Sequence, residues 1–381
     1  MGTLSRRRLE GSTRDWVTRR GWFKSGRPLA TEDTASSEEK YQEKKECDNS
    51  RSMTLLSSAD GRAVRGSERS EAESAGIGTA FSWTVGKLLQ FSIEWLVRLT
   101  GRRVEKRGAP WLDCVLGKPG FIGTRVYQQI AEEKDLELRM PPDAGLIPDF
   151  SVLRGPSFDP DGVNPRIRHF YEHAALYHLE VWSEVYLAGK FVLWLLVEFI
   201  SRKMDQLNFP ISSMEVAKGM TSEVVQLRER SSGKLVHTGW LRRFRATGKV
   251  IYAGFYSAAQ VPGESNPCVK VTFPCYGSSS VYLRPYLYKD GSFGLASTGA
   301  EFGKSGFYRI VEAGPEAWKV RAFTTLHEIF HVYVDEDGVL RTDHEIRFVG
   351  LTVLRLHYKM TLAENTRKRE PLGVAFSAES R

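Results

Sequence analysis

The part of the sequence that most restricts the fold is residues 221–360, where short apolar runs follow one another with only turn residues between them. No gap between the runs is long enough for a crossover helix, so consecutive strands must pair antiparallel. Asp290-Gly291 and Asp337-Gly338 are strong signals for tight hairpins. The predicted strands are Glu223–Glu229, Leu235–Arg245, Lys249–Ser257, Cys268–Cys275, Val281–Lys289, Phe293–Ser297, Phe307–Glu312, Trp318–Thr324, Leu326–Asp335, Val339–Phe348 and Leu351–Met360.

So many consecutive strands are expected to curl, because twisted open sheets rarely exceed ~10 strands while flat and because closure removes exposed edges. We therefore predict an α+β protein whose residues 215–362 form an antiparallel β-barrel-like domain or a strongly curved sheet. Before it we expect a disordered basic and polar tail over residues 1–77 and a helical segment with an irregular connector over 78–210. A polar tail follows over 363–381.

Alternation along the strands assigns side chains to the two faces of the sheet. Thr342 and His344 fall on the apolar face of their strand, and Tyr358 falls on the apolar face of the next strand. An interior lined by aromatic side chains with a few polar groups fits a cavity for a small ligand, and equally a filled core. The candidate ligand-binding residues are Trp240, Tyr252, Tyr256, Thr342, His344 and Tyr358.

The segment His327-Glu328-Ile329-Phe330-His331 matches the H-E-x-x-H pattern of zinc metalloproteases, in which two helical histidines bind the metal and the glutamate is the general base. The flanking residues favour a strand, on which side chains four positions apart are separated by ~13 Å. We therefore expect His327 and His331 to share one face without binding one ion, and Glu328 to lie on the other face. A zinc-dependent hydrolase that uses these three residues remains an alternative.

The N-terminal half contains a second motif, Gly117, Gly120 and Gly123, before a predicted helix at Thr124–Glu133. This G-x-x-G-x-x-G spacing resembles the nucleotide-binding turn of short-chain dehydrogenases and epimerases, where it would imply a bound dinucleotide. Only a short strand, Leu112–Leu116, precedes it, and after Leu136–Met140 no further βαβ unit follows. We expect a turn between a short strand and a helix, and no cofactor.

Two stretches have helical spacing of apolar residues. Residues 80–100 predict an amphipathic helix that covers the protein's own sheet or contacts a membrane peripherally. Residues 166–204 predict a long helix that begins after Pro165. His169 and His173 share a face of this helix, which is more typical of a hydrogen-bonded pair than of zinc ligands, because a structural zinc site needs about four ligands.

The net charge of +8 gives little evidence for nucleic-acid binding, because residues 1–27 contribute +6 of it. The four cysteines form no CxxC pair, and no apolar segment follows the basic start, so we expect a cytoplasmic protein with membrane contact restricted to residues 80–100. The sequence thus predicts a non-catalytic protein that holds an apolar or amphipathic small molecule or lipid. The alternatives are the zinc-dependent hydrolase and a structural or interaction protein with a solid core.

Overall fold

The computed structural model describes residues 94–117, 123, 125–186, 219–245, 247–274 and 277–363. All of them belong to the second of two compact units, residues 74–381. Several predictions lie outside these residues: the tail over 1–77, the start of the helix over 80–100, most of the glycine loop, the apolar part of the helix that was expected to reach residue 204, and nearly all of the tail over 363–381.

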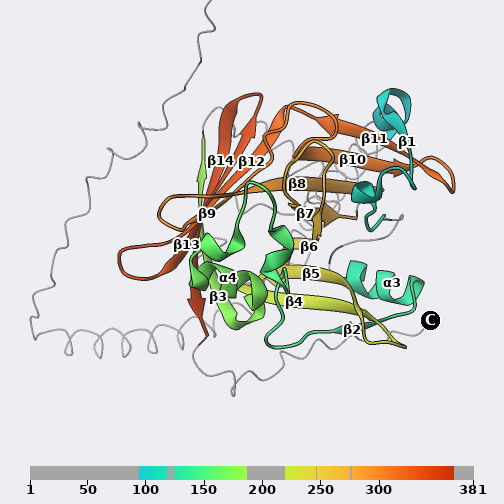
Figure 1. Cartoon of the computed structure of the whole chain (residues 1–381). Coiled ribbons are helices and arrows are strands. Elements are labelled where there is room, and N and C mark those ends of the chain that lie inside the picture. Colours follow the sequence, from blue (N-terminus) through green and yellow to red (C-terminus); the bar gives the residue numbers. More distant parts are fainter. Residues whose placement is uncertain are drawn as a thin grey trace, which may run out of the picture. The chain divides into compact units, whose positions relative to one another are not determined.

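The described part of the chain is mostly antiparallel β-sheet with few helices (Figure 1). Its main path runs β2-β4-β5-β6-β7-β8-β9-β12-β13-β14-β3, and β10, β11 and β1 branch from β8. The strands are β1 (Arg102–Glu105), β2 (Leu136–Arg139), β3 (Tyr177–Val185), β4 (Met220–Glu229), β5 (Leu235–Phe244), β6 (Val250–Ala259), β7 (Cys268–Phe273), β8 (Ser278–Leu287), β9 (Phe293–Ala296), β10 (Gly306–Glu312), β11 (Ala317–Phe323), β12 (Leu326–Val334), β13 (Leu340–Phe348) and β14 (Leu351–Leu362).

The prediction of an antiparallel meander after residue 220 is confirmed, and β4 to β14 follow the predicted runs closely. The hairpin turns form where the Asp-Gly pairs predicted them. Gly291 and Gly338 have φ values of 80° and 74°, a conformation that costs glycine little. Short turns of this kind leave each strand beside the one that follows it, which is why the sheet order so largely repeats the chain order.

The sheet curves so that its two ends approach each other. β4 is the second strand of the main path and β3 is the last, yet the two strands are in contact. Among the described residues no backbone pairing joins β3 to β4, so the observed sheet is not closed into a barrel. The main apolar core lies between the inner faces of this curved sheet and the segment that holds α4.

The helical prediction for residues 166–204 is correct only at its start. α4 (Pro165–Glu172) begins with Asn164, whose side chain accepts a hydrogen bond from the backbone N–H of Arg166. A short 3-10 helix (Ala174–Leu176) follows, and Tyr177–Val185 is then the strand β3 rather than a helix. Its apolar side chains four positions apart fit a helix and a strand equally. The exposed edge of β14 provides nine residue pairings, which decides the conformation.

The glycine segment does not begin a nucleotide-binding fold in the described residues. Leu112–Leu116 is not a strand, because a 3-10 helix (Pro110–Leu112) ends there and irregular chain follows. The predicted helix is confirmed as α3 (Arg125–Glu133), and the strand after it is confirmed as β2. β2 pairs antiparallel with β4, whereas a dinucleotide site needs parallel strands around a switch point.

Residues 94–100 are the described part of the expected amphipathic helix, and they are helical. Val97 is fully buried, whereas Trp95 and Leu99 are each 58% exposed. In the described ranges no helix combines the length and hydropathy that a membrane span requires.

Candidate functional site

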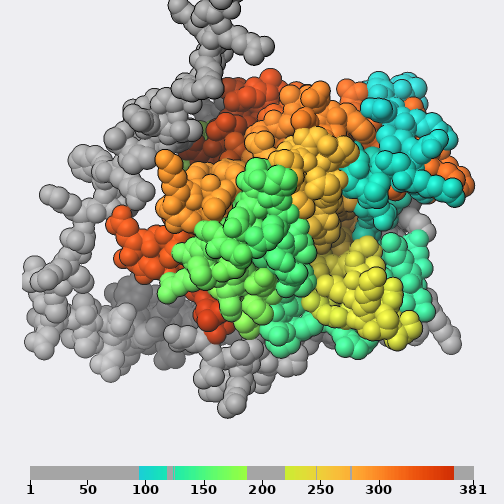
Figure 2. Space-filling view, in the orientation of Figure 1, coloured from blue at the N-terminus to red at the C-terminus, as the bar shows by residue number. Residues whose placement is uncertain are grey.

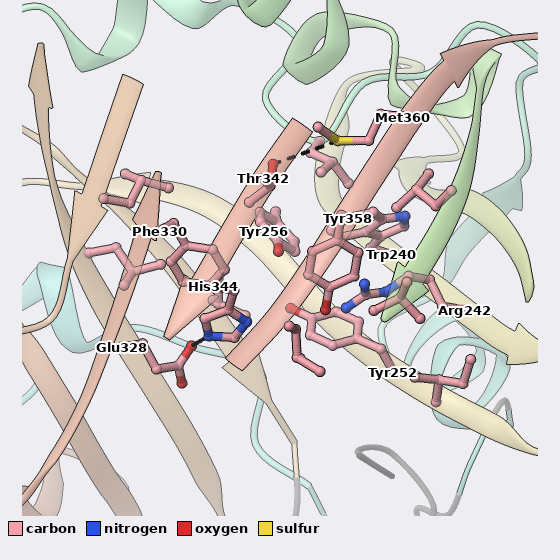
Figure 3. Close-up of a pocket in the computed structure, with 18 of the residues that line it drawn as sticks. Trp240, Arg242, Tyr252, Tyr256, Glu328, Phe330, Thr342, His344, Tyr358 and Met360 are labelled. Carbon is pink, nitrogen blue, oxygen red and sulfur yellow. Dashed lines mark hydrogen bonds and ion pairs between the residues drawn. The ribbon is translucent and has the colours of Figure 1, made fainter. Parts of the chain in front are cut away.

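A cavity of about 100 Å³ lies inside the curve of the sheet (Figure 3). Strands from both halves of the sheet contribute side chains to it, and Leu146, Phe170 and Tyr171 add apolar surface from α4 and the connector before it. Figure 2 shows this segment, in green, lying over the strands on the viewed face. The structure brings all six candidate residues to this one cavity: Trp240, Tyr252, Tyr256, Thr342, His344 and Tyr358.

The strand period explains why these side chains point inward. On β13, Leu340, Thr342, His344 and Ile346 are buried, while the residues between them are partly exposed. Pairing between adjacent strands then places inward side chains next to each other. For example, Thr342 on β13 lies opposite Tyr358 on β14. Because each strand turns one face to the interior, polar side chains at inward positions are held among apolar ones.

Of the described residues that line the cavity, Arg242 and His344 are the only basic ones, and Arg242 is only 7% exposed. Its guanidinium carbon lies 4.3 Å, 4.5 Å and 5.4 Å from the ring centroids of Trp240, Tyr252 and Tyr358. Its Nε is buried without a hydrogen-bond partner. Burial by itself lowers the pKa of Arg242, but the tyrosine oxygens around it raise that pKa above its ordinary value, so the side chain is a cation.

The tyrosines near Arg242 are neutral hydrogen-bonding groups. Burial raises the pKa of Tyr252 well above its ordinary value and raises that of Tyr256 to about 12. The hydroxyl of Tyr252, which is 7% exposed, has that of Tyr256 as its hydrogen-bonding neighbour. Buried polar groups in proteins nearly always have partners, so the Arg242 Nε marks an unsatisfied polar end of the cavity.

The other end of the cavity holds an acid and an imidazole (Figure 3). Glu328 Oε2 lies 3.2 Å from His344 Nε2, and the ring of His344 stacks on Phe330 with centroids 3.8 Å apart and planes at 15°. Phe330 and His344 are directly opposite each other in the pairing of β12 with β13. Near them Thr342 Oγ1 donates to Met360 Sδ at 3.8 Å.

The predicted strand geometry of the His-Glu-x-x-His segment is confirmed, because His327–His331 lies within β12. His331 Nε2 lies 2.9 Å from Ser292 Oγ, and His327 Nδ1 lies 2.8 Å from the carbonyl oxygen of Ser297. Glu328 points to the other face and into the cavity. In the described part of the chain no group of three or more His, Cys, Asp and Glu side chains is placed to hold a metal ion.

The second histidine pair, His169 and His173, also forms hydrogen bonds with nearby residues. The rings of His169 and His173 are 4.6 Å apart, and His169 Nδ1 lies 2.8 Å from the Tyr177 hydroxyl. His173 Nδ1 lies 3.2 Å from the carbonyl oxygen of Asp143. The Nδ1 atom of each of these two histidines is therefore taken up by a contact with the protein itself.

Arg242 and Phe330 line the cavity but were not among the sequence candidates, and Glu328 was considered only as a metal-site residue. The signal that could have found Arg242 is the strand period, since it lies two positions after Trp240 on the same strand. Its charge instead favours a solvated position, which is the usual place of arginine.

No family model matches the chain, and no solved structure matches it. The chain is 24% identical over 223 residues to the "Uncharacterized membrane protein YndJ" of Bacillus subtilis (strain 168). The match covers 57% of this chain and 38% of YndJ, so it spans less than two thirds of that relative.

Proposed function

We propose that the protein is a non-catalytic binding protein that holds a small apolar or amphipathic molecule in the cavity of the curved sheet. The observation that carries this proposal is the combination of an apolar and aromatic lining with a buried polar atom that lacks a partner, the Arg242 Nε. Such an interior, with few convergent polar groups, is the usual character of a small-molecule site.

The size of the cavity limits the ligand. Its volume of about 100 Å³ is below the ~300–1,000 Å³ of sites for drug-sized ligands, so we expect a small molecule or the end of a longer one. The contact of β3 with β4 supports a barrel-like enclosure in which these two strands form the seam. Movement at this seam would widen the interior for a longer chain.

Mass spectrometry of the purified full chain tests the proposal. Under native conditions the protein should carry a mass above that of its sequence, and denaturation followed by organic extraction should release the bound molecule. A native mass equal to the sequence mass, together with no extractable molecule, would favour the competing function, a structural or interaction protein with a solid core. The zinc-dependent hydrolase has less support, since His327 and His331 each contact a different partner.

Peripheral membrane contact through residues 80–100 is the accompanying proposal for location. It is supported by the exposure of Trp95 and Leu99, which lie one helical turn apart, and by the printed name of the relative as a membrane protein. The full chain should co-sediment with anionic phospholipid vesicles, and a Trp95→Ser, Leu99→Ser variant should bind them less. Equal sedimentation of both proteins would contradict the contact.

A further inference from the structure

We propose that the occupant of the cavity carries a single carboxylate, which pairs with the guanidinium of Arg242. This inference rests on the proposed binding function and adds the chemical class of the ligand. The polar end of the cavity, formed by Arg242, Tyr252 and Tyr358, would hold the carboxylate, and the apolar lining would hold the rest of the molecule.

Arg242 lacks a counter-charge within the described part of the protein. A charge that is removed from water is costly unless it is paired, and a buried arginine is normally matched by a carboxylate. Arg243, the next residue on β5, follows that rule, with its Nη2 2.9 Å from Glu223 Oε2. Among the described residues no carboxylate lies within ion-pair distance of Arg242, although it is only 7% exposed.

The side chains around Arg242 leave its Nε donor without a hydrogen-bond partner. Three aromatic rings surround the guanidinium, and their π faces stabilise its charge without accepting strong hydrogen bonds. The hydroxyl of Tyr358 is a partner for one donor. A guanidinium has five N–H donors, and the Nε donor is buried with no partner in the structure. A carboxylate can accept two of these donors in a planar, bidentate pair.

The charges that line the cavity favour a monoanion. Arg242 supplies one positive charge, and the aromatic rings around it add none. The acid at the opposite end, Glu328, is already beside His344 and adds negative charge to the cavity. A phosphate monoester carries close to two negative charges at neutral pH, so half of its charge would be left without compensation in this interior.

The test compares probes that share a phenyl ring and carry a monoanionic, a neutral or a dianionic polar group. Benzoate, benzyl alcohol and phenyl phosphate are titrated into the purified full chain, and binding is followed by calorimetry and by the fluorescence of Trp240, whose ring lies 4.3 Å from the guanidinium carbon. Benzoate should bind at least about tenfold more tightly than either other probe, as expected for a charge-assisted hydrogen bond. Arg242→Gln should remove that preference. Arg243→Gln, the matched control on the same strand, should keep it.

If Arg242→Gln does not fold, Tyr252→Phe provides the second variant, and it should weaken benzoate several-fold while leaving benzyl alcohol unchanged. Equal affinity for benzoate and benzyl alcohol, or a neutral co-purified molecule, would overturn the carboxylate while leaving the binding function in place. Tighter binding of phenyl phosphate would also overturn it in favour of a dianion. Failure of every probe to bind, with no co-purified molecule, would reject both proposals.

Discussion

The guanidinium carbon of Arg242 lies 5.4 Å from the ring centroid of Tyr358, although β5 and β14 are far apart in the strand order of the sheet. The contact exists because the sheet curves until its two ends meet around the cavity. The same pair therefore belongs to the fold and to the candidate site, since it joins the two halves of the sheet through a charge that has no carboxylate partner in the described residues.

A double-mutant cycle measures this contact. The cycle of Arg242→Met and Tyr358→Leu should give a coupling in the free energy of unfolding of about 0.5–2 kcal/mol, the range for a desolvated cation–π pair. Urea unfolding of the four proteins provides the values. A coupling within error of zero would mean that the two ends of the sheet do not meet in solution as they do in the structure.

The histidines of the His-Glu-x-x-His segment should behave as independent residues. His327→Ala and His331→Ala remove contacts with different partners, so their effects on the free energy of unfolding should add to within about 0.3–0.5 kcal/mol. Zinc content, measured by elemental analysis, should be the same in wild type and double variant. A coupling well above 0.5 kcal/mol, accompanied by loss of bound zinc, would instead require the two imidazoles to share one ion.

Gly239 should tolerate no side chain, because the ring of Tyr127 on α3 packs against it. A Cβ at Gly239 would lie 2.3 Å from Tyr127 Cε1, and the Tyr127 hydroxyl is fixed by donation to the carbonyl oxygen of Trp240 at 2.9 Å. Gly239→Ala should cost about 1–3 kcal/mol of unfolding free energy, as for other overpacked cores. Gly108→Ala is the matched control, since its Cβ would meet nothing closer than 3.8 Å, and it should change stability little.

The stability of the protein should fall as the pH is lowered from about 6.5 to about 4, in part because of His237. Burial, and then the nearby Lys134, lower the pKa of His237 to about 4. The unfolded state, with a histidine pKa of about 6.5, binds more protons across this window, so each step down in pH favours unfolding.

His237→Gln should remove on the order of 1–3 kcal/mol of the pH dependence between those limits. The measurement is the difference between wild type and variant in urea unfolding at pH 7 and pH 4, which cancels the other titrating groups. Identical pH dependence in the two proteins would show that His237 titrates normally.

Most of the sheet could be predicted from sequence because two local signals agreed there. Alternation identified the strands after residue 220, and the Asp-Gly pairs placed two of the turns, so β12 to β14 could be assigned with their inward faces. β3 could not be assigned, because the spacing of Tyr177, Val181 and Val185 fits both a helix and a strand. Its conformation is fixed by the free edge of β14, which is a tertiary effect that propensity does not contain.

The candidate site was predictable to the extent that it depends on the strand period. Thr342, His344 and Tyr358 were placed correctly on inner faces, but that they meet in one cavity with Trp240 and Tyr252 depends on the curvature of the whole sheet. The burial of Arg242, by contrast, could not be predicted from the strand period. The position of this side chain follows from alternation, yet a buried arginine without a carboxylate contradicts the ordinary behaviour of charged side chains. Exceptions of this kind are expected at functional sites, where local rules are violated.

A cavity-filling variant tests directly whether the cavity holds a bound molecule. Val271 lines the cavity and is 6% exposed, so Val271→Phe should occupy space that a ligand needs, while Val236→Phe at a position that is 38% exposed is the control. The native mass of wild type and of Val236→Phe should include a bound molecule, and Val271→Phe should lose it. If all three proteins have the mass of their sequence and Val271→Phe is more stable than wild type, the cavity is a packing defect and not a binding site.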